Sequence, residues 1–223
     1  MQGPSIILAS SKPLGEEDIR RIQRIGASDK KLSFANARRF GVGLNSFYHF
    51  TDTFELLAND CLYVFDPLKI AVATDKTKKC GGKYHCRRLE EFFPSMLLPF
   101  KNNALDRKKY PTIFRLPLRQ HTRTKFGGTI DVRLVREYFC GLTCKLENLL
   151  IYSKAIHEAT VTVVDSASTV TLASLTCEGT SSFMSTLPTS VQELKEVPSE
   201  RRQECMEMSV TGTVDAKPLR VTG

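Results

Sequence analysis

The first apolar runs of the chain predict a strand followed by a short helix. Residues 5–9 read SIILA, which is typical of a buried strand. In residues 15–26, isoleucines recur at every third position behind an acidic first turn, which the helix dipole favours. Gly26 is typical of a helix end. We therefore expect a strand, a turn and a helix that ends near Gly26.

A second apolar stripe follows the Gly-Val-Gly sequence of residues 41–43. Leu44, Phe47 and Tyr48 are spaced so that they share one face of a helix. Glycines before a helix are typical of a phosphate site, because the backbone can approach the anion closely and free N–H groups face it. They are equally typical of a tight turn that packs a helix against a sheet without any ligand. Both interpretations stay open.

The middle of the chain predicts more strands and one basic loop. Residues 60–66 are strand-like, and residues 70–74 form another candidate strand. Residues 74–88 are rich in Lys and Arg and contain Gly-Gly, which predicts a hairpin tip or a mobile loop. Residues 110–119 predict a strand in which Pro117 forces an edge or bulge position, because proline donates no hydrogen bond to a neighbour.

The remaining pattern becomes less regular toward the C-terminus. Residues 92–100 are apolar but contain two prolines, which predicts an irregular packed segment. Residues 127–153 predict a short strand or turn and then a helix. Residues 160–164 and 169–177 alternate Thr or Ser with apolar residues, which predicts a hairpin. The rest is rich in Ser and Thr, and we expect residues 178–223 to be less ordered than the first 152.

Length and charge divide the chain in the same place. The 223 residues suit one domain with an appendage, so we expect a domain at residues 1–152 and a C-terminal segment at 153–223. Residues 1–152 carry 26 Lys and Arg against 15 Asp and Glu, whereas residues 153–223 carry 6 against 9. A basic first part attracts anions such as nucleotides, nucleic acid or acidic proteins, although a solvated surface has the same composition.

Cysteine usage and hydropathy indicate a cytoplasmic location. The seven cysteines are odd in number and scattered, which argues against a disulfide framework. The N-terminus lacks the basic start of a signal peptide, and no run of residues is long enough for a membrane helix, so we expect no membrane partner.

Two groups of cysteines lie close enough in the sequence to be considered as candidate sites. Cys80, His85 and Cys86 have no common zinc spacing, so no metal site is expected. Cys140 and Cys144 would share a helix face, where we expect them to be small buried apolar residues.

Several of these segments, in order, resemble a known family. The strand at residues 5–9 is followed by EEDIRRIQRIGASDKK, RRFGVGLNSFYHFTD, DCLYVFDP and TIFRLPLR. This series resembles the ATPase-like modules of sacsin, which belong to the superfamily of gyrase, heat-shock chaperone, histidine kinase and mismatch-repair proteins (GHKL). The resemblance covers residues 1–120 well and residues 121–152 weakly.

The resemblance implies a fold and a chaperone-related function. It implies an α+β fold, here a partial GHKL (Bergerat-type) two-layer α/β sandwich that lacks the family's first helix. A β-rich or poorly ordered C-terminal segment would follow. ATP would lie between helices and sheet under a mobile lid. The implied nucleotide contacts are Ser11, Gly41, Val42, Gly43, Leu44 and Thr112.

The chain departs from the family pattern in ways that predict weak binding without hydrolysis. The family helix that carries the activating glutamate and the magnesium-binding asparagine is not matched, so no catalytic residue is assigned and magnesium is not expected. Ser11 stands where the family has the acid that reads adenine, and the glycine before Thr112 is replaced by Pro111. Serine accepts a weaker hydrogen bond than a carboxylate does. Whether the chain is an enzyme therefore stays open. An uncovered sheet face would favour self-association or client proteins.

A non-enzymatic binding module is the alternative. Its partner would be nucleic acid or an acidic protein, held by basic residues with Tyr84 and Tyr110 interleaved for base stacking. The candidate contacts are Lys76, Lys78, Lys79, Lys83, Arg87, Arg88, Lys101, Arg107, Lys108, Lys109, Arg119, Arg123 and Lys125.

Overall fold

The structure, a computed structural model, divides into two compact units. Unit 1 comprises Met1–Ala27 and Gly41–Val132, and unit 2 comprises Ser28–Phe40 and Arg133–Gly223. The residues that the structure describes are 3–22, 43–69, 80–101, 105–120, 124–143, 145–146, 150, 156–164, 168–178, 209–214 and 217–222. Each unit is described by itself below.

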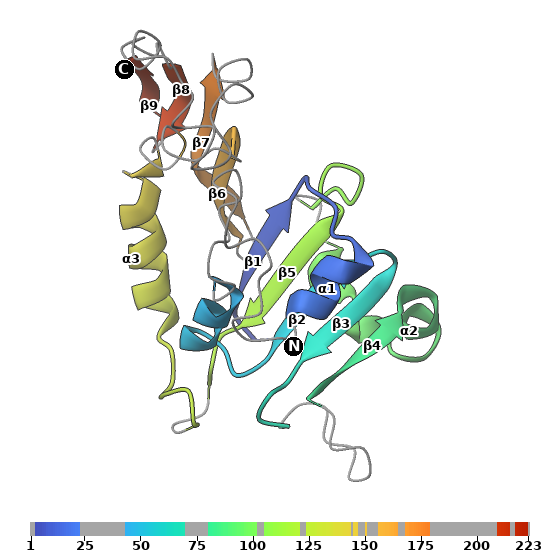
Figure 1. Ribbon diagram of the computed structural model, residues 1–223. Helices are drawn as coiled ribbons and strands as arrows, with labels where there is room; N and C mark the ends of the chain where they lie inside the picture. The colour runs from blue at the N-terminus through green and yellow to red at the C-terminus, as the bar shows by residue number, and fades with distance from the viewer. Residues whose placement is uncertain are drawn as a thin grey trace, which may run out of the picture. The chain divides into compact units, whose positions relative to one another are not determined.

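Unit 1 is built on a five-stranded antiparallel sheet (Figure 1). Its strand order is β1 (Ser5–Ser10), β5 (Thr112–Pro117), β2 (Phe54–Ala58), β3 (Cys61–Phe65) and β4 (Gly81–His85). The last strand in the sequence of this unit therefore lies in the interior of the sheet, between β1 and β2. With the helices described next, this sheet confirms the mixed α+β class.

One face of the sheet is covered by two helical segments. The α-helix α1 (Glu16–Ile22) and the 3-10 helix η1 (Gly43–His49) pack there. Ile19 of α1 and Phe47 of η1 join a cluster of buried side chains from the strands. Phe47 meets Phe54 and Phe114 edge to face, with ring centroids 5.4 and 5.6 Å apart. Such aromatic pairs stabilise the packing beyond the area that they bury.

The opposite face is covered by the segment that follows β4. It consists of the α-helix α2 (Cys86–Phe92) and two 3-10 turns, η2 (Pro94–Met96) and η3 (Leu98–Phe100). Leu89, Leu97 and Phe100 pack against Leu57 and Leu62 of the sheet. Every residue of β3 is buried, because side chains that alternate between two faces meet a covering segment on each.

Two of the predicted strands take a different place in the sheet from the one expected. The strand at residues 5–9 is confirmed as β1, but it is an edge strand rather than a buried one, and Leu8 is 38% exposed. The strand containing Pro117 is confirmed as β5, but it is an interior strand. Pro117 is tolerated because β5 pairs with β2 only as far as Arg115, so no β2 carbonyl needs a proline N–H.

Two local expectations in unit 1 were wrong in detail, and a third is not tested. The stripe after Gly43 forms a 3-10 helix instead of an α-helix. Part of the expected basic loop is the strand β4 followed by α2, so Gly81 and Gly82 belong to the sheet. Gly81 has a φ of 141°, and a side chain there would meet the carbonyl oxygen of Val64, which explains the glycine. The strand expected at residues 70–74 lies outside the described residues.

Unit 2 contains a helix and a four-stranded antiparallel sheet. The helix α3 begins at the boundary (Val132–Thr143), and the sheet order is β6 (Glu158–Val164), β7 (Thr169–Glu178), β8 (Ser209–Val214) and β9 (Lys217–Thr222). The predicted helix and the β6–β7 hairpin are confirmed. The strands β8 and β9 were not predicted.

The core of unit 2 lies beside the β6–β7 hairpin. Leu146 and Leu150 pack against Ala173, Leu175 and Cys177. Cys140 is exposed, so the expectation of a buried residue was wrong for that cysteine, and the side chain of Cys144 lies outside the described residues. The domain boundary expected after residue 152 stays a prediction. In the part of the chain that the structure describes, no helix is long and apolar enough to cross a membrane.

Candidate functional site

The sheet brings two of the expected nucleotide contacts to one end of β1 and β5. Ser10 pairs with Thr112, so Ser11 follows directly beside the start of β5. The hydroxyl of Thr112 donates to the carbonyl oxygen of Lys12 at 2.8 Å. Thr112 is buried and Ser11 is exposed. The single hydroxyl proton of Thr112 is therefore used within the protein, whereas Ser11 is accessible to a ligand.

Two further expected contacts, Gly43 and Leu44, lie at the start of η1. A side chain at Gly43 would meet no atom of the described residues within 4 Å. Leu44 is half-buried against the core below α1. Gly41 and Val42 lie outside the described residues. Packing therefore does not require a glycine at position 43, and a ligand can approach the backbone there.

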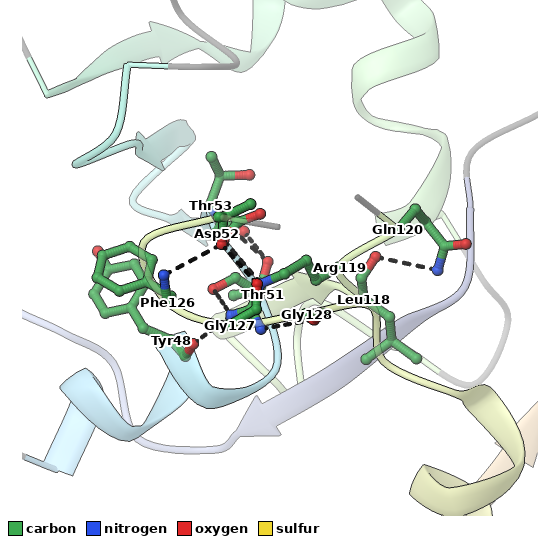
Figure 2. Close-up of polar contacts among 11 residues, drawn as sticks. Tyr48, Thr51, Asp52, Thr53, Leu118, Arg119, Gln120, Phe126, Gly127 and Gly128 are labelled. Carbon is green, nitrogen blue, oxygen red and sulfur yellow. Dashed lines mark hydrogen bonds and ion pairs between the residues drawn. The ribbon is translucent and has the colours of Figure 1, made fainter. Parts of the chain in front are cut away.

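A buried ion pair fixes the far end of η1, and sequence reasoning missed it. The Nε of Arg119 donates to Oδ1 of Asp52 at 2.9 Å, and the side chain of Arg119 is 1% exposed. Its other nitrogens donate to the carbonyl oxygen of Tyr48 at 2.6 Å and to that of Gly128 at 3.1 Å (Figure 2). A buried guanidinium is tolerated when its donors are satisfied in this way.

The same ion pair holds a tight turn formed by Thr124–Gly128. The hydroxyl of Thr124 donates to Oδ1 of Asp52 at 2.7 Å, and the backbone N–H of Thr124 donates to the carbonyl oxygen of Gly127 at 2.9 Å. Gly127 has a φ of 143°, and a side chain there would lie 2.9 Å from Nη1 of Arg119. The turn therefore needs glycine both for its backbone conformation and for the close approach of Arg119.

Two aromatic rings stack where the turn meets η1. The rings of Phe126 and Tyr48 are nearly parallel, with centroids 4.7 Å apart and an interplanar angle of 24°. Figure 2 shows them side by side at the edge of the Arg119 network. Burial, followed by the negative charge of Asp66, raises the pKa of Tyr48 to about 12. The Tyr48 hydroxyl therefore keeps its proton at neutral pH and can donate a hydrogen bond.

These rings form part of the wall of a cleft of about 1120 Å³ in unit 1. The cleft lies between α1, η1, β3 and β4. Three cations line it, Arg20, Lys83 and Lys125, together with aromatic residues. Lys83 lies over the ring of Tyr63, with Nζ 5.5 Å from its centroid, which is a cation–π contact. Cations beside aromatic faces suit a planar ligand that carries negative charge.

The cleft and the expected contacts are different parts of unit 1. The four expected contacts that the structure describes are Ser11, Gly43, Leu44 and Thr112, and none of them lines the cleft. Asn45, Tyr48 and His49, which follow Gly43 in η1, do line it. No sequence signal marked Tyr48 as part of this wall, because it belongs to the same apolar stripe as Leu44 and packs against the same core.

The basic surface of the alternative interpretation is smaller than expected. Arg119 is buried, so its assignment as a surface contact was wrong. Arg107 pairs with Asp60 at 3.0 Å, and Lys101 pairs with Glu90 at 3.3 Å. Lys76, Lys78, Lys79 and Arg123 lie outside the described residues. Binding of nucleic acid or of an acidic protein stays a prediction, as do client binding and self-association.

Within the described residues, no three His, Cys, Asp or Glu side chains come together as metal ligands. Cys86 is buried, and its burial raises the pKa of its thiol. Cys61 and His85 do approach each other, with Sγ 3.4 Å from Nδ1, across the β3–β4 pair. This contact joins paired residues of neighbouring strands.

Comparison with known proteins extends the resemblance. The family model of the sacsin domain matches residues 1–175, past the part of the chain on which the resemblance was recognised. Human sacsin is 27% identical over 173 residues, which cover 74% of this chain. The chain spans 4% of the length of that relative. The family match includes all of unit 1, the helix α3 and most of the β6–β7 hairpin, and the chain therefore belongs to the sacsin domain family.

Proposed function

We propose that unit 1 binds a nucleotide, with weak affinity and little preference between adenine and guanine. The observation that carries this proposal is the cleft between α1, η1, β3 and β4, in which three cations and stacked aromatic rings line one hollow. A nucleotide combines the two features that such a lining recognises, a planar base and negatively charged phosphates.

Family membership supports the proposal at a coarser level. A sacsin domain with a five-stranded antiparallel sheet and helices is compatible with the GHKL (Bergerat-type) ATPase fold that the sequence resembles. In that fold the nucleotide lies between the sheet and the helices that cover it. The cleft is on the α1 and η1 side of the sheet, where these helices lie.

The expected weakness follows because the charged acceptor with which the family reads adenine is missing at the end of β1, away from the cleft. Ser11 offers a hydroxyl in place of the acid that reads adenine, and Thr112 already donates its proton to Lys12. Neither supplies a charged acceptor for the amino group of adenine. The affinity should then come mainly from phosphate charge and base stacking, which do not distinguish the two purines.

Isothermal titration calorimetry with ATP and GTP tests the proposal. We expect similar heats for both nucleotides and weaker binding at higher salt, because salt screens contacts between exposed charges. A phosphate-release assay run in parallel should stay at background, as the sequence predicts. Absence of binding by either nucleotide would show that the cleft does not serve this function. Tight binding that selects adenine would show that the account of Ser11 is wrong.

Two variants then locate the nucleotide. Gly43→Val places a branched side chain at the start of η1, where it meets no protein atom, so a loss of binding would report a phosphate nearby. Ser11→Asp should raise the preference for adenine if the base lies at the end of β1. Gly141→Val serves as a control, because Gly141 lies in unit 2 and is also free of neighbours within 4 Å.

A further inference from the structure

The turn of Thr124–Gly128 places the side chain of Phe126 in the wall of the cleft. The backbone N–H of Phe126 donates to the hydroxyl of Thr124 at 3.2 Å, and Thr124 is itself held by Asp52. Gly127, on the other side, is pressed against Arg119. Thr124, two residues before Phe126, and Gly127, directly after it, thus both contact the buried ion pair, which restricts where the ring can lie.

The ring of Phe126 is supported on one face and accessible elsewhere. Tyr48 stacks against it from η1 at 4.7 Å (Figure 2). Phe126 nevertheless keeps 36% of its surface exposed and lines the cleft. A large apolar ring that packs against a neighbour and is still exposed is a favourable stacking surface, because a side chain that is already ordered loses little conformational entropy when a ligand binds.

The charges around this ring suit a phosphorylated ligand. Lys125 precedes Phe126 in the turn and also lines the cleft, and Lys83 lies in β4 over the ring of Tyr63. Glu16 is the carboxylate among the described lining residues, and its oxygen lies 3.5 Å from Nη2 of Arg20. That carboxylate is therefore already balanced by a cation, which leaves Lys83 and Lys125 for an incoming anion.

From this arrangement we infer that Phe126 is the base-stacking residue of the nucleotide cleft, with Tyr48 as its support and Lys125 as a phosphate contact. The inference rests on the proposed function and adds the position and the mode of base binding. It places the base against the turn of Thr124–Gly128 instead of at Ser11 and Thr112. Stacking on a ring tolerates any base, which agrees with the expected lack of purine selectivity.

Calorimetry with ATP and with inorganic tripolyphosphate separates base binding from phosphate binding. Phe126→Leu removes the ring and keeps an apolar side chain, so ATP affinity should fall about 5- to 150-fold, the range for loss of one stacked base. The affinity for tripolyphosphate should not change. Phe126→Tyr retains the ring and should behave as the parent does. Lys125→Ala should weaken both probes, because both carry the phosphates.

Controls make each outcome decisive. Phe93→Leu removes an exposed phenylalanine from the segment after α2, on the other side of the sheet, and should leave ATP binding unchanged. Thermal unfolding of every variant checks that the fold persists. If the parent binds neither probe, the proposed function itself fails. If the parent binds ATP and Phe126→Leu binds it equally well, the function stands and the stacking role is overturned. Equal loss of both probes in a folded Phe126→Leu would also overturn it.

Discussion

Arg119 shows how far a single residue can differ from its sequence-based assignment. Its position in a basic stretch predicted a surface contact, yet its side chain is almost completely buried beside Asp52. Three carbonyl oxygens, those of Tyr48, Thr51 and Gly128, accept hydrogen bonds from its remaining nitrogens. A charged residue that directly follows an apolar strand can end such a strand or enter the core, and local sequence does not distinguish the two.

Arg119→Met should destabilise unit 1 strongly. The substitution leaves the carboxylate of Asp52 buried without its cation, and breaking a buried pair in this way typically costs about 3–5 kcal/mol. Urea unfolding followed by circular dichroism measures the change.

The matched control is Arg107→Met, which breaks the exposed pair with Asp60. Exposed pairs contribute about 0–1 kcal/mol, so this variant should unfold close to the parent. Equal destabilisation by both substitutions would contradict the assignment of Arg119 and Asp52 as a structural centre.

The candidate site was only partly predictable from sequence for a related reason. Ser11, Gly43 and Thr112 were predicted as contacts because each belongs to a local motif, but none of them lines the cleft, so their role stays a prediction. Phe126 and Lys125 meet Tyr48 only through the fold, since more than seventy residues separate the turn from η1. No local sequence pattern predicts that these two segments lie close together. An exposed phenylalanine next to a lysine does not by itself indicate a binding site.

At the scale of elements, five strands were predictable from the sequence, whereas β2, β4, β8 and β9 and the order of the strands in the sheet were not. Alternation and apolar runs identified β1, β3, β5, β6 and β7. The same patterns could not reveal that β1 lies at the edge and β5 in the interior, because sheet order depends on pairing between distant segments. β4 was missed because Gly81 and Gly82 lower its strand propensity, although the close approach to Val64 requires a glycine at position 81.

Glycine-to-alanine substitutions in two elements should have opposite effects. Gly127→Ala places a side chain at a φ of 143° and 2.9 Å from Arg119, so it should lower the free energy of unfolding by more than about 1 kcal/mol. Gly141→Ala lies within α3, where no neighbour is within 4 Å, and should raise the free energy of unfolding by about 0.5–1 kcal/mol. Thermal unfolding of both variants tests the signs. A stabilised Gly127→Ala would contradict the described turn.

At the scale of the whole molecule, the described residues give each unit a core of its own, and the core of unit 1 lies on both faces of its sheet. Leu56 is fully buried in unit 1, and Leu175 is almost fully buried in unit 2. The sacsin domain match covers residues 1–175, which include all of unit 1 and part of unit 2. The domain that defines the family therefore coincides with neither compact unit.

Leu56→Ala and Leu175→Ala test whether the two cores unfold separately. Each substitution should lower the free energy of unfolding of its own unit by about 2–5 kcal/mol, because it removes buried apolar surface and leaves a cavity. Hydrogen exchange followed by mass spectrometry should show faster exchange in the strands of the mutated unit only. Faster exchange throughout both sheets for either variant would show that the units unfold as one.

The order of strands in the sheet of unit 1 also affects how the chain folds while it is being synthesised. Thr112 pairs with Ser10, and its hydroxyl reaches the backbone of a residue 100 positions earlier. While the chain is being synthesised, β1 and β2 therefore wait for β5, the strand that lies between them. At roughly 5–20 residues per second, that interval lasts several seconds. Throughout it, the apolar strands β1 and β2 lack the strand that lies between them and are open to wrong pairing until residue 117 has left the ribosome.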